Sequence, residues 1–151
     1  MVSGPFKETE VPPEPEAVTG YAMVAEAFPG VQSMYIAGFV IPVPEEKMEA
    51  YRKWAENGAA IFREYGCIEI VDSWEDNVPS GKYTDFRRAV DAKDGEKIVF
   101  SWQVWPDKAT LDSAEAKMHE DERFEVAGEI PFDPKRLILG CFKPVYTMGR
   151  E

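Results

Sequence analysis

The fold of this chain can be worked out from one stretch, Tyr35-Ile-Ala-Gly-Phe-Val-Ile-Pro-Val43. Its β-branched and aromatic residues form a nearly continuous apolar run, which is typical of a buried strand. Pro44 follows at a position where a helix begins, and Glu45 and Glu46 complement the positive end of a helix dipole. The stretch therefore predicts a strand that leads directly into a helix.

The helix expected after Pro44 carries a single apolar stripe. Its members recur at three- and four-residue steps: Met48, Tyr51, Ala55, Ala59, Phe62 and Tyr65. Gly66 supplies the left-handed residue that ends such a helix. A second strand is expected over residues 67–74, with Ile68, Ile70, Asp72 and Trp74 on one face.

Two more strand-like runs, Tyr83–Ala92 and Lys97–Trp105, flank a short connection that contains Asp94-Gly95. An Asp-Gly dipeptide between β-like runs is a hairpin signal. Asp107 is then a candidate N-cap for a second helix, whose apolar positions are Leu111, Ala114 and Met118. We expect a loop with short turns over residues 121–135 and a last strand over 136–142, continuing towards residue 146.

The predicted order is β-α-β-(β)-β-α-β, which defines the fold class as α+β: a ferredoxin-like split β-α-β with an added hairpin strand. Such a fold is an antiparallel sheet with helices on one face only. The other face is apolar and must be covered. A second copy of the same sheet is the simplest cover and gives a closed homodimer, and the alternative is that the N-terminal segment folds across it.

Charge divides the chain into two parts. Lys and Arg number 17 against 28 Asp and Glu, so the net charge is 17 − 28 = −11. This balance argues against nucleic acid and against an anionic membrane surface as partners. Residues 1–33 form a proline- and glutamate-rich arm, and residues 34–151 form the predicted domain. Met34 directly precedes the first strand and is an alternative start.

Several blocks of the sequence resemble the YbaA-like family of small bacterial proteins of unknown function. The resemblance is carried by residues 35–44, 66–82, 84–87 (Thr-Asp-Phe-Arg), 99–102 (Val-Phe-Ser-Trp) and 131–136 (Pro-Phe-Asp-Pro-Lys-Arg), in order and at the family's spacing. It implies a dimeric α/β-barrel, related to cofactor-free monooxygenase and small-molecule-binding domains. It implies no activity.

The candidate ligand-binding residues lie on the predicted third and fourth strands. Asp85 and Arg87 are two apart, so on a strand they would share a face and form a charge-assisted pair. Ser101, Gln103 and Trp105 likewise share one face, which suits a pocket with a few polar groups in an apolar lining. The alternative for both sets is packing within the core or at a dimer interface.

Other reactive residue types give no recognisable site. His119 is the one histidine and falls near the end of the second helix, and Cys67 and Cys141 lie far apart. We therefore expect no metal, no cofactor, two reduced thiols and a cytoplasmic location. The 131–136 segment is either a lid or a rigid connection, and its two prolines favour the connection.

Three functions remain open at this point. The first is a homodimer that binds a small apolar or aromatic molecule in or beside the barrel. The second is a cofactor-free monooxygenase- or isomerase-like enzyme, with Asp85, Arg87, Ser101 or Gln103 in polar roles and Trp105 in the lining. The third is a structural or protein-interaction module. The sequence identifies no catalytic residue.

Overall fold

The computed structural model describes residues 34–126 and 128–149, and the predictions for the arm at 1–33 lie outside this part. All helices and strands discussed below belong to one compact unit, Met34–Lys143. Residues 144–149 fall in a second unit and contain no helix or strand.

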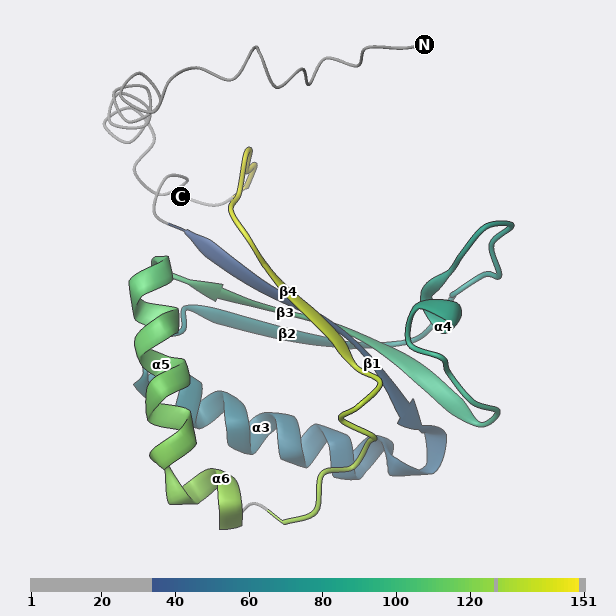
Figure 1. Ribbon diagram of the computed structural model, residues 1–151, viewed down its shortest axis with the longest axis horizontal. Coiled ribbons are helices and arrows are strands. Elements are labelled where there is room, and N and C mark those ends of the chain that lie inside the picture. The colour runs from purple at the N-terminus through teal and green to yellow at the C-terminus, as the bar shows by residue number, and fades with distance from the viewer. Residues whose placement is uncertain (1–33, 127, 150–151) are drawn as a thin grey trace. The chain divides into compact units, whose positions relative to one another are not determined.

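The sheet has four antiparallel strands in the order β2-β3-β1-β4. Their bounds are β1 Tyr35–Pro44, β2 Glu69–Trp74, β3 Glu96–Trp105 and β4 Ile138–Phe142. The helices are α3 (Met48–Glu64), α5 (Lys108–Glu120) and the short α6 (Glu122–Val126), with a 3-10 turn η2 (Glu45–Lys47) before α3. This β-α-β-β-α-β order confirms the predicted ferredoxin-like α+β fold, and α3 and α5 lie on the same side of the sheet (Figure 1).

The helix boundaries follow the local signals in the sequence. Asp107 caps α5 by accepting a hydrogen bond from the backbone N–H of Thr110 at 2.7 Å. Gly66 ends the turn after α3 with a φ of +107°, and a Cβ there would lie 2.9 Å from Thr110 Cγ2. Gly66 is therefore required by its backbone conformation and by the close approach of α5.

The predicted strand at Tyr83–Ala92 is wrong. The segment is an irregular loop that contains one short helix, α4 (Phe86–Ala89). Asp85 caps this helix by accepting from the backbone N–H of Arg88 at 2.8 Å and from that of Gly81 at 3.0 Å. Such local side-chain-to-backbone bonds compete with strand pairing, so the added hairpin strand does not form. Within 121–135, α6 is also a helix that the sequence analysis expected only as a turn.

The register of β1 on β3 sorts the side chains onto two faces. Ala37 lies opposite Gln103, Phe39 opposite Ser101 and Ile41 opposite Val99, and all of these side chains are on the helix side. The core on that side forms two clusters. One contains Ala37, Cys67, Trp105, Leu111 and Ala114; the other contains Ile41, Val43, Tyr51, Val99 and Phe132.

The opposite, open face is also apolar. Phe100 is 46 % exposed, Ile138 44 % and Phe142 61 %, and all three lie on this face by the register. Phe86, the first residue of α4, covers one end of it, with its ring 5.9 Å from that of Phe100. The open face is therefore a hydrophobic surface over the centre of the sheet.

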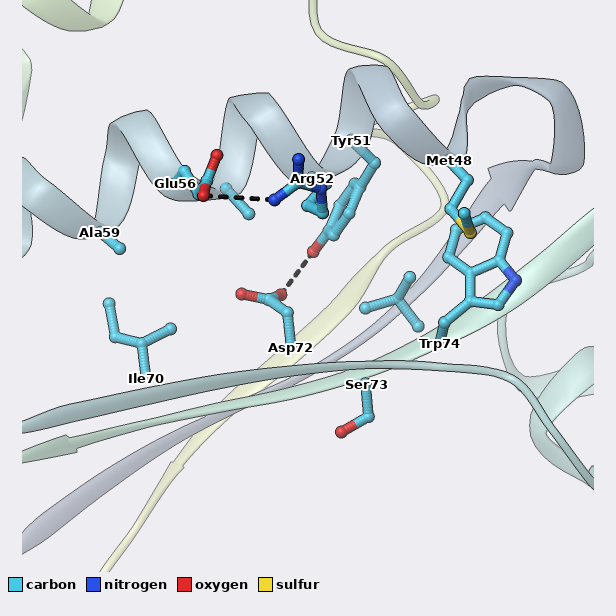
Figure 2. Close-up of a pocket in the computed structure, with 11 residues that line it drawn as sticks. Met48, Tyr51, Arg52, Glu56, Ala59, Ile70, Asp72, Ser73 and Trp74 are labelled. Atoms are coloured by element: carbon cyan, nitrogen blue, oxygen red, sulfur yellow. Dashed lines mark hydrogen bonds and ion pairs between the residues drawn. The ribbon is translucent and has the colours of Figure 1, made fainter.

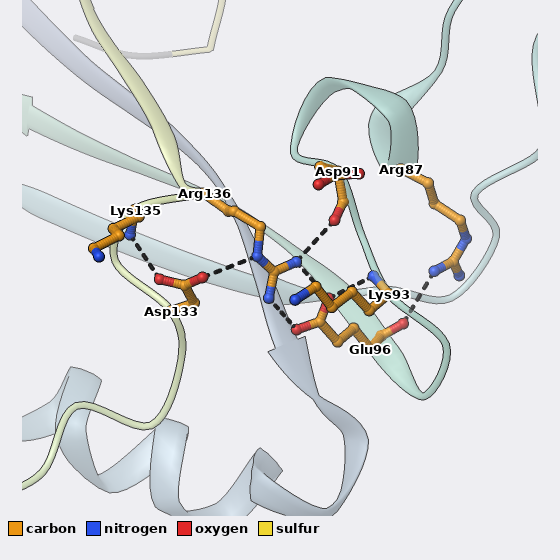
Figure 3. A network of polar contacts seen from close by, with 7 residues as sticks. All are labelled: Arg87, Asp91, Lys93, Glu96, Asp133, Lys135 and Arg136. Atoms are coloured by element: carbon orange, nitrogen blue, oxygen red, sulfur yellow. Dashed lines mark hydrogen bonds and ion pairs between the residues drawn. The ribbon is translucent and has the colours of Figure 1, made fainter.

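A network of charges holds the segment at 131–136 to the start of β3 (Figure 3). The Arg136 guanidinium donates to both carboxylate oxygens of Glu96, at 2.7 and 2.6 Å, and to Asp133 at 3.0 Å. Arg136 also donates to the backbone carbonyl of Asp91, and Arg87 donates to that of Glu96. These bonds hold the segment as a fixed connection in this structure.

We expect Arg136→Met to lower the free energy of unfolding by about 3 kcal/mol, because it leaves the Glu96 carboxylate buried without its cation. Arg52→Met is the matched control, since Arg52 forms exposed pairs with Glu49 and Glu56 on α3 and should cost about 0.5 kcal/mol. Urea denaturation of the three proteins measures the difference. Equal stability of the two variants would contradict a structural role for the Arg136 network.

Candidate functional site

The inner cavity, with a volume of about 340 Å³, lies between the helix side of the sheet and helices α3, α5 and α6. It touches both core clusters: Ala37 and Leu111 belong to one, Ile41 and Tyr51 to the other. The sheet contributes Ala37, Phe39, Ile41, Ile70, Asp72, Ser101, Gln103, Leu139 and Cys141 to the lining. The cavity is thus a partly open space between the sheet and the helices, with an apolar lining and few polar groups.

Two polar residues of β3 lie on the floor of the inner cavity. Ser101 is buried, at 5 % exposure, and Gln103 is half-buried. The indole N–H of Trp105 donates to Oε1 of Gln103 at 3.0 Å. Because an indole N–H can only donate, this bond fixes the amide orientation and leaves the Gln103 NH₂ group as a donor. The floor therefore offers an oriented amide donor and a hydroxyl.

Tyr51 and Asp72 form the wall at one side of the inner cavity. The Tyr51 hydroxyl donates to Oδ1 of Asp72 at 2.6 Å. Burial of the ring, together with the hydrogen bond to the carboxylate and its charge, raises the pKa of Tyr51 well above its usual value. The hydroxyl is therefore held as a neutral donor throughout the physiological range.

An outer groove of about 330 Å³ lies on the other side of this wall, between α3 and β2. Figure 2 shows Met48 and Tyr51 reaching from α3 towards β2, and Ile70, Asp72 and Trp74 reaching back, while Arg52 and Glu56 pair with each other along the helix. Tyr51, Asp72, Ile70, Ala55 and Ala59 line both spaces. The Tyr51–Asp72 pair thus stands between the inner cavity and the outer groove.

Aromatic rings pack against both ends of the inner cavity. Trp54 and Phe132 make an edge-to-face contact with centroids 5.1 Å apart. At the other end Phe62 lies 6.1 Å from Trp105 and 5.5 Å from Phe124. Such contacts stabilise the packing and give the cavity flat apolar walls.

Arg123 of α6 contributes charge at the rim of the inner cavity. Its guanidinium lies 2.7 Å from the Asp121 carboxylate and 2.8 Å from that of Glu64. The hydrogen bonds from Arg123 and from the Tyr65 hydroxyl hold the pKa of Asp121 well below its usual range. Arg123 is therefore engaged by two carboxylates and is not a free cation at the cavity.

The predicted site residues form two groups, Asp85 with Arg87 and Ser101 with Gln103 and Trp105, and the structure places these groups apart. Ser101 and Gln103 share the cavity floor, and Trp105 follows them on the same face of β3, where it is fully buried and does not line the cavity. The predicted Asp85–Arg87 pair does not form, because neither residue is on a strand. Asp85 caps α4 and lies 3.5 Å from Arg88, whereas Arg87 is bonded to Glu75.

The histidine and the cysteines occupy places that fit packing. His119 lies in the last turn of α5, where the sequence analysis placed it, and is exposed. Cys67 is buried, donates weakly to two backbone carbonyls, and has its pKa raised by burial. Cys141 lies on β4 at the open side of the inner cavity.

Sequence reasoning missed Tyr51 and Asp72 as members of a polar pair. In the sequence, Tyr51 is one of the apolar positions of the first helix and Asp72 one residue of a strand face, and neither position predicts the contact. The signal that could have found them is the acidic residue between Ile70 and Trp74 on a face that is otherwise apolar. A carboxylate on the helix side of the sheet can accept a hydrogen bond from a donor on the helix packed above it, as Asp72 does from Tyr51.

Within 34–126 and 128–149, the structure contains no group of three or more His, Cys, Asp or Glu residues arranged to hold a metal ion. In the same residues, none of the helices combines the length and apolar character required to cross a membrane.

Comparison with known proteins gives close relatives in sequence and distant ones in structure. The family model described as "Protein of unknown function (DUF1428)" matches residues 34–134. Proteins named "Uncharacterized protein YbaA" from Escherichia coli (strain K12) and Shigella flexneri are each 46 % identical over 112 residues, 74 % of this chain and 96 % of theirs.

Among solved structures, the chain is similar to a point mutant of SnoaB from Streptomyces nogalater, which is described as a cofactor-independent oxygenase. The TM-score is 0.47 at 14 % identity, covering 78 % of this chain and 99 % of that one. It is also similar to the de novo designed protein Foldit4, with a TM-score of 0.36 at 13 % identity, covering 73 % and 94 % of the two chains.

The raised pKa of Tyr51 predicts a dependence of stability on alkaline pH. The folded pKa lies above the unfolded value of about 10, so the stabilisation is fully present below pH 10 and is lost as the pH rises above it. We expect the free energy of unfolding to fall with rising pH more steeply in the wild type than in Tyr51→Phe. Absorbance at 295 nm in the native state at pH 11 should be the same for both proteins, and a wild-type excess of one tyrosinate would contradict the prediction.

Proposed function

The chain belongs to the family described as "Protein of unknown function (DUF1428)", and because membership brings no activity with it, we propose a function from the chain's own geometry. The protein binds a small, largely apolar molecule in the inner cavity. The observation that carries this proposal is a space of about 340 Å³ between the two core clusters, with an apolar lining and an oriented donor on its floor. The enzymatic and interaction-module functions stay predictions.

The size and lining of the cavity support this function. Ligand pockets usually have volumes of about 300–1,000 Å³ and an apolar lining with a few polar groups. An unfilled apolar space of this size between packed elements is costly to stability, because its walls lose contacts that a ligand would restore. A fold that forms such a space is therefore well suited to bind a molecule there.

The polar groups on the floor define the chemistry of the ligand. The free NH₂ of Gln103 donates, and the hydroxyl of Ser101 can donate or accept. The flat walls formed by Trp54 and Phe62 favour a ring system. We therefore propose an aromatic molecule that carries a carbonyl oxygen or a similar acceptor.

Acetophenone and ethylbenzene test the proposal as a matched pair, because they differ in the carbonyl oxygen. We expect acetophenone to bind the full chain, and Gln103→Leu to weaken its binding about tenfold through the lost hydrogen bond. Ethylbenzene should be insensitive to this change. Ligand-observed NMR titrations measure both affinities.

Occlusion of the cavity locates the bound molecule. Gly58 of α3 lines the cavity, and Gly58→Leu should abolish binding of both probes. Gly58→Ala provides the control for the change in helix propensity and should retain binding. If acetophenone binds Gly58→Leu as well as the wild type, the ligand lies elsewhere and the proposal is wrong.

We also propose that the chain is a homodimer that buries the open face of the sheet. Phe100, Ile138 and Phe142 support this, because large exposed apolar surfaces on a sheet mark interaction sites. A two-fold axis over the sheet would bury the same residues of both copies. The open face, rather than the inner cavity, is thereby assigned to the second copy.

Light scattering after size exclusion tests the dimer at micromolar concentration. We expect the wild type to have the mass of two chains and Phe100→Lys to have the mass of one, since a charge at the centre of the interface cannot be desolvated. Tyr83→Lys is the control, because Tyr83 is an aromatic residue of the α4 loop that is 87 % exposed. A wild-type monomer would contradict the proposal.

The cysteines support a cytoplasmic location as part of the proposal. Cys67 and Cys141 are both free, one buried and one exposed. An exposed free thiol is usual in a reducing compartment.

A further inference from the structure

Strand β2 is at one edge of the sheet, and its backbone has a free side. Within the described residues it pairs with β3 alone. The N–H of Glu75 donates to the carbonyl of Ile98. In an antiparallel pair, every second residue of a strand bonds to the partner strand, so Val71 and Ser73 also bond to β3. The backbone groups of Ile70, Asp72 and Trp74 therefore point away from the sheet, and they form a short open edge.

The outer groove lies directly beside this open edge. The side chains of Ile70, Asp72 and Trp74 point into the groove, while Ser73 points to the other face of the sheet (Figure 2). Met48 and Arg52 of α3 form the opposite wall. The same three residues thus present both free backbone groups and the side chains of a groove, which is the arrangement by which an added strand is bound.

Charge defines the side chain that fits the middle of this site. Glu56 and Asp72 contribute two carboxylates to the groove lining, against the single guanidinium of Arg52, which lies 3.3 Å from Glu56 and is also paired with Glu49 outside the lining. The Asp72 carboxylate stands between the apolar subsites of Ile70 and Trp74. The groove is therefore complementary to a cation flanked by apolar side chains.

We propose that the β2 edge and the outer groove bind an extended peptide of another protein with the pattern apolar-x-basic-x-apolar. The basic side chain lies opposite Asp72, and the apolar side chains lie opposite Ile70 and Trp74. The peptide adds a fifth strand to the sheet through backbone hydrogen bonds. This proposal does not rest on the proposed function: Ile70 and Asp72 also line the inner cavity, but the peptide uses their free backbone groups and the groove beside them.

The same charges disfavour two other occupants. A second copy paired about Asp72 would set the two carboxylates opposite one another, and like charges directly opposite destabilise a strand pair. The residues at 1–33 contain Lys7 against five glutamates and lack the required pattern around that lysine. A basic segment of a different protein fits the groove best.

The peptide Thr-Leu-Thr-Lys-Thr-Leu-Thr, labelled with fluorescein, tests the proposal against the full chain by fluorescence anisotropy. Its sequence is the same in both directions, so it fits a parallel or an antiparallel register. We expect saturable binding that weakens about tenfold when the lysine of the peptide is replaced by glutamate. Asp72→Asn should give a similar loss, while its side-chain oxygen still accepts from Tyr51. Equal affinity for the lysine and glutamate peptides would overturn the proposal.

Backbone methylation separates strand addition from a simple charge contact. In an antiparallel register, N-methylation of the leucine and lysine residues removes the N–H groups that face β2, and should weaken binding about tenfold or more. N-methylation of the intervening threonines then removes N–H groups that face solvent, and should change affinity less than about twofold. In a parallel register the two sets of N–H groups exchange places, and so do the two effects. If both methylated peptides bind as the parent does, no strand is added and the proposal is wrong.

Two further measurements complete the test. Gly58→Leu should leave the peptide affinity unchanged, because Gly58 does not line the groove. Loss of peptide binding in that variant would place the peptide in the inner cavity and overturn the proposal. The molecular mass of Asp72→Asn should equal that of the wild type, and a change in oligomeric state would instead identify the edge as an interface between copies.

Discussion

The antiparallel pairing of β1 with β3 is the constraint on which the rest of this structure depends. Ten residue pairs, from Tyr35 with Trp105 to Pro44 with Glu96, fix one register over the full length of both strands. Since side chains alternate between faces, a slip of one residue would exchange the two faces of the sheet. The register is therefore what places Ser101 and Gln103 under the helices and Phe100 on the open face.

The register gives the sheet a helix side, an open side and a β2 edge. These three surfaces differ in chemistry, and we propose a different binding partner for each. The helix side borders the inner cavity, where the apolar lining and the Gln103 amide suit a small molecule. The open side is apolar and suits a second copy of the chain. The β2 edge combines free backbone groups with a carboxylate. The inner cavity and the groove share five lining residues, but Gly58 and Gln103 line the cavity alone and Phe100 lies on the open face, so the cavity and the open face can each be tested outside the shared set.

Most of the fold could be predicted from the sequence, because its signals are local. The apolar stripe of the first helix, the stop at Gly66 and the cap at Asp107 each depend on residues within one or two turns. The strand predicted at residues 83–92 does not form, and a local contact explains why. Val90 and its neighbours resemble a strand in composition, but the Asp85 carboxylate bonds to nearby backbone N–H groups and holds a short helix instead. Composition alone does not report that competition.

The sequence by itself determined the order of elements, the acidic character of the chain and the face that Ser101, Gln103 and Trp105 share, since these follow from residue types and from the two-residue period of a strand. Only the tertiary structure decided which charges meet. Tyr51 and Asp72 are 21 residues apart, and Glu96 and Arg136 are 40 apart. Their pairing depends on how α3 packs on the sheet and on how the 131–136 segment returns to β3. No local pattern encodes these contacts, because they arise only when the register and the helix packing are both in place.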